Sequence, residues 1–322
     1  MSQVGIVILN YNNTKEIIGC IESIITYLPK DKIKCVVVDN GSNDLNREYI
    51  HSYLEKKSSS YRRLNGGDRC DILEDFTYLC LPKNVGYACG NNAGIDFLNL
   101  YESISHIMIL NSDIIITEDI VTPLLQQIEQ LPNVGALSPL LYTPSGEVDH
   151  CCARYNYPID ILKYTFSYVF ANKYNEACKR LKVLLREPTL VYNKVVEIEL
   201  PSGSCMLFRK DTLNEIGGFD PNTFLYYEES IMYKRLKEKG KQNYILPSVS
   251  CIHIGGSTTT NQKTAYFLKK CNYESLLYYL ETYEKVPFGA KIYIKFTGKL
   301  RLARLKLGFI YKKMMRRNKN KV

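Results

Sequence analysis

The sequence predicts an α/β fold built around a largely parallel sheet. Short runs of consecutive apolar, β-branched residues recur along it, as in strands that are buried on both faces. These runs alternate with segments of helical periodicity, the pattern of βαβ units with right-handed crossovers. With 322 residues, the chain is long enough to bury a substantial core, as one large domain or as one domain plus an appendage.

The first 130 residues have the pattern of a nucleotide-binding α/β half. A first strand is predicted at residues 4–9, the run VGIVIL. After the polar loop at residues 10–13, Thr14 is placed to cap a helix with a face of isoleucines. Further strands are predicted at residues 34–38, 76–81 and 106–110, and a further helix at residues 90–100.

The second half has a less regular pattern. Strands are predicted at residues 195–200, 205–209, 244–246 and 248–253, and a helix at residues 229–239. This helix should end at Gly240, because glycine is the usual C-cap residue. An insertion at residues 155–186 is expected to cover the site, and the pattern is helical from Thr264 onward.

Composition narrows the class of protein. Hydrophobic residues make up 45% and charged residues 23% of the chain, as in ordinary globular domains. No run of eighteen apolar residues predicts a membrane span, and the N-terminus lacks the basic region and cleavage site of a secretory signal. Eleven cysteines without a CxxC pair indicate neither a zinc site nor a disulfide framework, and favour reduced thiols in the cytoplasm.

The charge of the chain is concentrated at one end. The net charge is +9, yet residues 287–322 hold twelve Lys or Arg and no acid, which leaves the rest of the chain at −3. Apolar residues alternate with these cations, as in helices that lie on anionic lipid. The alternative is a solvated or disordered tail. A nucleic-acid-binding protein is disfavoured, because the cations are confined to one end.

Polar residues follow the predicted strands of the first half. They include Asn10 and Asn12 after the first strand, Asp39 after the second, Asn84 after the third and residues 111–113 after the fourth. Ligands of open parallel sheets lie beyond the carboxyl ends of the strands. A ligand site is therefore expected at this edge.

Four residues could carry chemistry, and each has a structural alternative. Asp113 has the oxygen ligands that Mg²⁺ or Mn²⁺ prefers, but it could also belong to a polar turn. His253 could bind a metal ion or phosphate, or be a hydrogen-bonded structural residue. Glu228 and Glu229 could include a general base, or favour a helix start through the helix dipole.

The loop at residues 84–92 is rich in glycine and asparagine and leads into a helix. Its backbone N–H groups could hold phosphate at the helix start. It lacks the lysine of a P-loop and does not match GxGxxG, so those nucleotide-binding folds are poorly supported.

Seven segments, in order, resemble the family 2 glycosyltransferases with the GT-A fold. They are GIVILNYN, VVVDNGSND, KNVGYACGNNAGI, MILNSD, PSGSCMLFRKDTLNEIGGFD, FLYYEES and CIHIGGST. The likeness is strongest to the rhamnosyltransferase-like branch that builds bacterial surface polysaccharides, and it covers residues 4–257. It implies a mixed central sheet flanked by helices, with a helical, basic C-terminal extension.

The resemblance assigns roles to individual residues. It places a UDP- or dTDP-sugar donor against Asn10, Asn12, Asp39, Asn40, Asn84, Gly86, Asn92, Asn111 and Ser112. Asp113 takes the last position of the metal-binding DxD motif, in an NxD form, and His253 completes the metal site. The acceptor-side loop is matched by Ser202, Gly203 and Ser204. Glu228 and Glu229 match a Glu-Asp pair whose second member is the base, although Glu229 is one methylene longer.

The implied activity is an inverting, Mn²⁺- or Mg²⁺-dependent transfer of a hexosyl or rhamnosyl group to a hydroxyl of a saccharide, expected to be lipid-linked, in capsule or O-antigen synthesis. The alternative is a non-catalytic nucleotide-sugar- or glycan-binding relative of the same fold. The domains expected are residues 1–262, with a nucleotide half (1–130) and an acceptor half (131–262), and the extension 263–322. The expected location is cytoplasmic, peripheral at the inner face of the plasma membrane.

Overall fold

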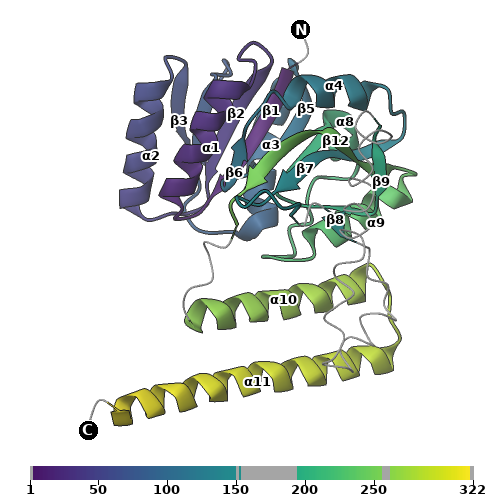
Figure 1. Cartoon of the computed structure of the whole chain (residues 1–322). Coiled ribbons are helices and arrows are strands. Elements are labelled where there is room, and N and C mark those ends of the chain that lie inside the picture. Colours follow the sequence, from purple (N-terminus) through teal and green to yellow (C-terminus); the bar gives the residue numbers. More distant parts are fainter. Residues whose placement is uncertain (1–2, 150–151, 154–193, 256–261, 320–322) are drawn as a thin grey trace. The chain divides into compact units, whose positions relative to one another are not determined.

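A computed structural model of the chain describes residues 3–149, 152–153, 194–255 and 262–319 (Figure 1). Its described residues divide into two compact units. The first holds residues 3–149, 152–153, 194–221 and 228–255, and the second holds residues 222–227 and 262–319. The insertion expected at residues 155–186 lies outside the described residues.

A ten-stranded sheet forms the centre of the first unit. The strands are β1 (Gln3–Asn10), β2 (Ile33–Asp39), β3 (Tyr61–Asn65), β4 (Phe76–Cys80), β5 (Ile104–Asn111), β6 (Ile114–Ile116), β7 (Val134–Tyr142), β9 (Val196–Ile198), β11 (Cys205–Arg209) and β12 (Gln242–His253). Their order is β3-β4-β2-β1-β5-β11-β7-β12-β6, with β9 paired to β12. Two further strands, β8 (Cys152–Ala153) and β10 (Leu200–Pro201), form a separate small sheet.

The sheet is parallel from β3 to β5 and becomes mixed beyond β5. The antiparallel strand β11 joins β5 to β7, and β6 adds antiparallel to β12. Strand β1 lies between β2 and β5, which pair with its two opposite edges. The order in which the strands are added to the sheet reverses at β1. The ends of β1 and β5 therefore flank the topological switch point, where open α/β sheets bind ligands.

Helices cover both faces of the sheet (Figure 1). They are α1 (Thr14–Tyr27), α2 (Asp44–Lys57), α3 (Gly86–Asn99), α4 (Val121–Glu129), α8 (Lys210–Glu215) and α9 (Glu228–Glu238). Apolar residues of α1, α2 and α4 share one core with the sheet, and those of α3, α8 and α9 share the other. The first unit thus has three layers, helices on a mixed sheet on helices.

Glycines bring α3 close to the central strands. A Cβ on Gly94 would lie 2.5 Å from a methyl carbon of Val7, and one on Gly90 would lie 2.5 Å from a methyl carbon of Leu9. A Cβ on Gly5 of β1 would lie 2.6 Å from a methyl carbon of Leu98. This close packing fixes the start of α3 beside the ends of β1 and β2.

Most of the predicted elements are confirmed, with some differences in detail. The helix predicted from residue 90 already begins at Gly86, and the two strands predicted at residues 244–253 form one strand, β12. The capping role predicted for Thr14 is wrong, because Asn13 is the N-cap and no side chain caps α1. Thr14 instead hydrogen-bonds to the side chain of Asn46.

The second unit contains two helices, α10 (Gln262–Thr282) and α11 (Phe288–Lys319), and it confirms the predicted helical extension. The ring of Tyr273 on α10 packs against Gly298 of α11, and its hydroxyl donates to the carbonyl of Lys295, 2.9 Å away. Lys295 also pairs with Glu281 at 2.7 Å. In the described part of the chain, no helix has the length and apolar character needed to cross a membrane.

Candidate functional site

The carboxylate of Asp39 is fully buried at the end of β2. One of its oxygens accepts hydrogen bonds from the backbone N–H of Ser42 and from Nε of Arg47, both at 2.9 Å, and the other accepts from the hydroxyl of Tyr78 at 3.1 Å. The ion pair with Arg47 compensates the buried charge. Arg47 was not predicted as a site residue, because its helix α2 has only a weak apolar pattern.

Asn40 joins the end of β2 to the start of α3. Its amide nitrogen donates to Oδ1 of Asn84 at 3.1 Å and to the carbonyl of Gly86 at 3.0 Å, and its oxygen accepts from the N–H of Val85 at 2.9 Å. Gly86 has a φ of 88°, a conformation that glycine adopts without strain. The predicted residues Asn40, Asn84 and Gly86 thus form one network.

Three other predicted asparagines differ in their surroundings. Asn12, with a φ of 52°, accepts hydrogen bonds from the N–H and the amide of Asn43 at 2.9 and 3.0 Å. Asn10 is fully buried, and neither polar atom of its amide has a hydrogen-bond partner. Asn92 lies apart from these, because its amide bonds to the N–H and carbonyl of Phe219 at 2.9 and 2.7 Å.

Asp113 and His253 lie side by side where β6 and β12 pair. The N–H of Ile254 donates to the carbonyl of Asp113, and Nε2 of His253 lies 3.4 Å from Oδ2 of Asp113. The other ring nitrogen, Nδ1, lies 2.7 Å from Oδ2 of Asp149. Burial acts to lower the pKa of His253, but the hydrogen bonds and charges of the two aspartates outweigh it and raise that pKa.

Asp149 was missed by the sequence interpretation. It follows a hairpin after β7, where its N–H donates to the carbonyl of Leu141. No strand was predicted before it, and it lies in the second half of the chain, where the sequence pattern is less regular, so nothing local marked it as a site residue. The sequence separation of 104 residues from His253 hides the contact.

The predicted acceptor-side loop lies next to the Asp113–His253 pair. The N–H of Asn111 donates to the carbonyl of Ser204 at 2.9 Å, and the hydroxyl of Ser204 lies 3.5 Å from Nε2 of His253. The hydroxyl of Ser202 donates to that of Ser204 at 3.1 Å. Ser112, between Asn111 and Asp113, is buried.

Glu229 contacts the same loop from the first turn of α9. Its Oε1 accepts a hydrogen bond from the N–H of Gly203 at 3.2 Å. Burial raises the pKa of Glu229, and the backbone hydrogen bonds, which act in the opposite direction, do not cancel this effect. The neighbouring Glu228 is buried.

Tyr87 also holds this loop and was not predicted as a site residue. Its hydroxyl donates to the carbonyl of Gly203 at 2.7 Å, and its ring packs edge-on against Phe219 at 5.6 Å between centroids. Burial, followed by the charges of Glu229 and Glu228, raises the pKa of Tyr87, so the phenol stays protonated as a donor. Gly203 is therefore held by Tyr87 at its carbonyl and Glu229 at its N–H.

A divalent ion at this site would need oxygen or nitrogen ligands from the described residues. No group of three His, Cys, Asp or Glu among them is arranged as a metal site. However, Oδ2 of Asp113 and Nε2 of His253 are 3.4 Å apart, close to the roughly 3 Å between neighbouring ligands of an octahedral ion with bonds of about 2.1 Å. Asp149 on Nδ1 matches the carboxylate partner that orients metal-binding histidines. Two protein ligands suit Mg²⁺ or Mn²⁺, which retain water and substrate phosphate as the others.

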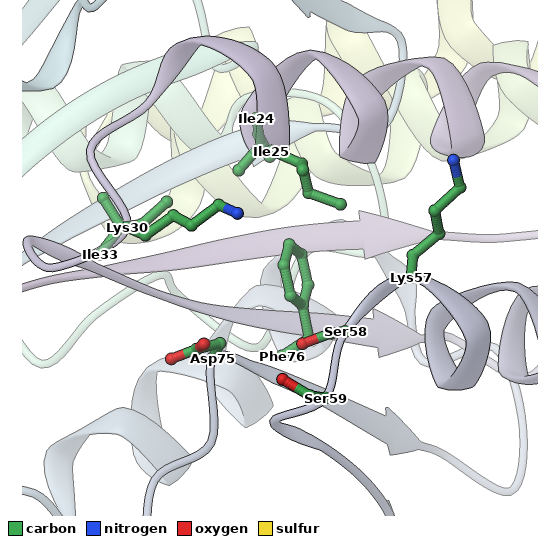
Figure 2. A pocket seen from close by; sticks show the side chains of 9 residues that line it. All are labelled: Ile24, Ile25, Lys30, Ile33, Lys57, Ser58, Ser59, Asp75 and Phe76. Atoms are coloured by element: carbon green, nitrogen blue, oxygen red, sulfur yellow. The ribbon is translucent and has the colours of Figure 1, made fainter.

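A small pocket of about 100 Å³ lies at the opposite edge of the sheet (Figure 2). It is lined by Phe76 at the start of β4 and by Ile33 at the start of β2. Lys57, the last residue of α2, and Lys30, just after α1, also line it. Lys57 lies in the last turn of α2, where a cation complements the helix dipole. None of the predicted site residues lines this pocket.

The comparison with known protein families identifies the chain. It belongs to glycosyl transferase family 2, whose family model matches residues 5–217. Two curated relatives are similar over a short segment, the N-acetylglucosaminyl-diphospho-decaprenol L-rhamnosyltransferases of two Mycobacterium tuberculosis strains (CDC 1551 / Oshkosh and ATCC 25618 / H37Rv). Each is 34% identical over 58 residues, 18% of this chain and 19% of the relative, so the match spans about a fifth of those proteins.

Solved structures establish the fold. GalNAc-T7, solved with UDP, GalNAc and Mn²⁺, is similar with a TM-score of 0.58 and 13% identity, over 92% of this chain and 54% of that one. The mannosyltransferase PcManGT from Pyrobaculum calidifontis, solved with GDP-Man and Mn²⁺, is similar with a TM-score of 0.52 and 15% identity, over 95% of this chain and 73% of that one. The chain thus has the GT-A fold, as the sequence predicted.

Proposed function

We propose that this chain is an inverting, metal-dependent glycosyltransferase that moves a sugar from a UDP- or dTDP-sugar to a hydroxyl group. The observation that carries the proposal is the loop Ser202–Ser204. Gly203 holds the carboxylate of Glu229 on one side, and Ser204 contacts His253, the partner of Asp113, on the other. The loop thereby connects the candidate base, Glu229, with the candidate metal ligands, Asp113 and His253.

Glu229 acts as the general base. Burial raises its pKa, which strengthens the carboxylate as a proton acceptor. It removes the proton from the acceptor hydroxyl, whose oxygen forms the new bond to the anomeric carbon. The bond from that carbon to the diphosphate breaks on the opposite face, so the anomeric configuration inverts.

Asp113 and His253 are the residues that would hold Mn²⁺ or Mg²⁺. Such an ion would neutralise charge that develops on the departing diphosphate. With the proton of a neutral His253 on Nδ1, directed to Asp149, Nε2 would be free to bind the ion. Both structural neighbours were solved with Mn²⁺, which is consistent with this choice of ion.

The nucleotide-sugar is assigned to the ends of the parallel strands. The residues proposed to contact it are Asn10, Asn12, Asp39, Asn40, Asn84, Gly86, Asn92, Asn111 and Ser112. The unpaired amide of Asn10 supports this assignment, because a buried amide without partners costs about 1–3 kcal/mol and a nucleobase edge offers complementary groups. Asn92 has the weakest case, because Phe219 already occupies both its polar atoms.

The acceptor is proposed to be a saccharide carried on a lipid, beside Ser202, Gly203 and Ser204. Helix α11 supports this view, because it has exposed large apolar side chains at four-residue intervals, at Phe288, Ile292, Phe296 and Leu300. At 100° per residue these four lie within roughly 120° of the helix circumference. Lysines and arginines alternate with these apolar residues in the sequence. In an anionic membrane, the headgroups attract the cations and the acyl chains take up the apolar side chains. Peripheral attachment at the cytoplasmic face of the plasma membrane follows from this proposal.

Vesicle flotation tests the membrane part. The wild-type chain is expected to float with phosphatidylglycerol vesicles and to remain in solution with phosphatidylcholine vesicles. The double variant Phe296→Ser, Leu300→Ser should lose most of this binding, whereas Tyr49→Ser, at an exposed site on α2, should not. Equal flotation of all three proteins would contradict the membrane role.

A panel of nucleotide sugars tests the transferase itself. The wild-type chain is incubated with UDP-, dTDP- and GDP-sugars, with Mn²⁺ or with EDTA, and release of the nucleoside diphosphate is measured. Release from a UDP- or dTDP-sugar that needs Mn²⁺ and disappears in Asp113→Ala supports the proposal. Binding of a donor without release, even with candidate saccharide acceptors present, would favour the alternative of a non-catalytic relative.

A further inference from the structure

Two consecutive tyrosines precede the proposed base in an unusual backbone conformation. Tyr226 and Tyr227 have φ angles of 75° and 72°. Bulky residues rarely adopt positive φ, and glycine is the residue that does so without strain. Such a conformation persists only where the surrounding contacts enforce it. The next residues along the chain are Glu228 and Glu229.

Helix α10 supplies these contacts, within the second unit. The ring of Tyr227 stacks on that of Tyr279, with 5.4 Å between centroids and 28° between planes. Tyr279 is buried and is itself fixed by a hydrogen bond from its hydroxyl to Glu284 at 2.7 Å. The buried hydroxyl of Ser275 donates to the carbonyl of Leu225 at 2.9 Å.

Further contacts hold the start of the same segment. The amide of Asn222 donates to the hydroxyl of Tyr278 at 3.1 Å. Phe224 packs edge-on against Phe267, with 5.5 Å between ring centroids. Residues 222–227 are therefore attached to α10 at four positions along their length.

We propose that α10 positions the catalytic base. By holding residues 222–227 in their strained path, it sets the direction in which the chain enters α9 and so the place of the Glu229 carboxylate against Gly203. This inference rests on the proposed role of Glu229 as base, and it makes Tyr227, Tyr279 and Ser275 positioning residues. The C-terminal extension is then a part of the catalytic machinery as well as a candidate membrane contact.

The presence of tyrosine rather than glycine at position 227 agrees with this role. Glycine would remove the strain, but it would also remove the ring that stacks on Tyr279. The stacking fixes the direction of the chain at the cost of backbone strain. Release of the anchor should let the segment relax to negative φ and move Glu229 away from its hydrogen bond.

The experiment compares Tyr279→Ala with Tyr279→Phe and with Tyr273→Ala. Tyr279→Phe retains the stacked ring. Tyr273→Ala removes a ring of the same size from the same helix, but one that contacts α11 instead of residues 222–227. The first readout is hydrogen exchange of a peptide covering residues 222–232. The second is turnover with the UDP- or dTDP-sugar that the panel identifies, together with the Kd of UDP in Mn²⁺.

Tyr279→Ala is expected to speed hydrogen exchange of that peptide and to lower kcat at least 10-fold, with the Kd of UDP changed less than 2-fold. Tyr279→Phe should retain at least half of the wild-type turnover, and Tyr273→Ala should behave similarly. The inference is overturned if Tyr279→Ala keeps wild-type turnover, or if Tyr273→Ala loses as much as Tyr279→Ala does. Turnover of Glu229→Gln separates the two proposals. Full turnover of this variant removes Glu229 as the base. If Glu229→Gln loses turnover while Tyr279→Ala keeps it, only the role of α10 is removed.

Discussion

Replacing Gly203 with alanine tests how tightly the loop holds the base. A Cβ at this position would lie 2.8 Å from Oε1 of Glu229 and 3.2 Å from the hydroxyl of Tyr87. Its backbone φ is not among the positive values, so alanine introduces no backbone strain. The carboxylate must therefore move by several tenths of an ångström, away from the N–H of Gly203.

We expect this substitution mainly to lower the rate of catalysis. Loss of one hydrogen bond to a charged group is worth about 1.5–3 kcal/mol, and a misplacement of about 1 Å costs on the order of 100-fold in rate. We expect kcat to fall about 10- to 100-fold, with the Kd of UDP in Mn²⁺ and the Tm nearly unchanged. Steady-state release of the nucleoside diphosphate, calorimetry and thermal unfolding measure the three quantities.

Gly289→Ala provides the matched control, because a Cβ there meets no atom within 4 Å. This variant should match the wild-type protein in all three measurements. A kcat for Gly203→Ala within 2-fold of wild type, in a protein of normal Tm, would refute the idea that the loop fixes Glu229.

Three other predictions follow from the site and the fold. Burial raises the pKa of Glu229, so the wild-type protein loses stability as the pH rises through this raised pKa. Glu229→Gln should therefore have a higher Tm than wild type at pH 7.5, and the difference should shrink at pH 4. A difference in Tm that does not depend on pH would contradict the assignment. Asp149→Asn removes the charge beside Nδ1 of His253 and should weaken Mn²⁺ binding about 10- to 100-fold in calorimetry with UDP present. An unchanged Mn²⁺ affinity would count against a metal-binding role of His253. Gly41→Ala should lower the free energy of unfolding by more than about 2 kcal/mol in urea titrations, because its φ is +76° and its Cβ would lie 2.2 Å from the backbone of Lys83; wild-type stability would show that this loop can rearrange.

The parallel half of the sheet was predictable because each of its buried strands is a local apolar run. The run VGIVIL needs no partner to be recognised, and β1, β2, β4 and β5 all appear where such runs occur. Helix α2 and strand β3 were not predicted, because Asp44–Lys57 has few apolar residues and Tyr61–Asn65 is an edge strand. Pro247 led to the prediction of two strands where β12 is continuous, with an irregular register against β7 between Leu246 and Ser250.

The candidate site was predictable only in part, because its contacts join distant segments. The positions of Asp113 and His253 followed from the strand ends and the motif order, and the structure brings their side chains together. Asp149 and Tyr87 were missed, since their roles depend on contacts across 104 and 116 residues that no local pattern reveals. The Tyr226–Tyr227 kink was also invisible in the sequence, because nothing but packing permits a tyrosine to hold a positive φ.

The central claim is that Glu229 takes the proton from the acceptor while the Asp113 side of the site binds the donor. Its most direct test is turnover of Glu229→Gln in Mn²⁺, measured with the donor that the panel identifies, beside the Kd of UDP for the same protein. Glutamine keeps the size of the side chain and an oxygen that can accept from Gly203, so donor binding should stay within 2-fold of wild type. Turnover is predicted to fall at least 1,000-fold. A Glu229→Gln protein that binds UDP normally and turns over at the wild-type rate would contradict the account.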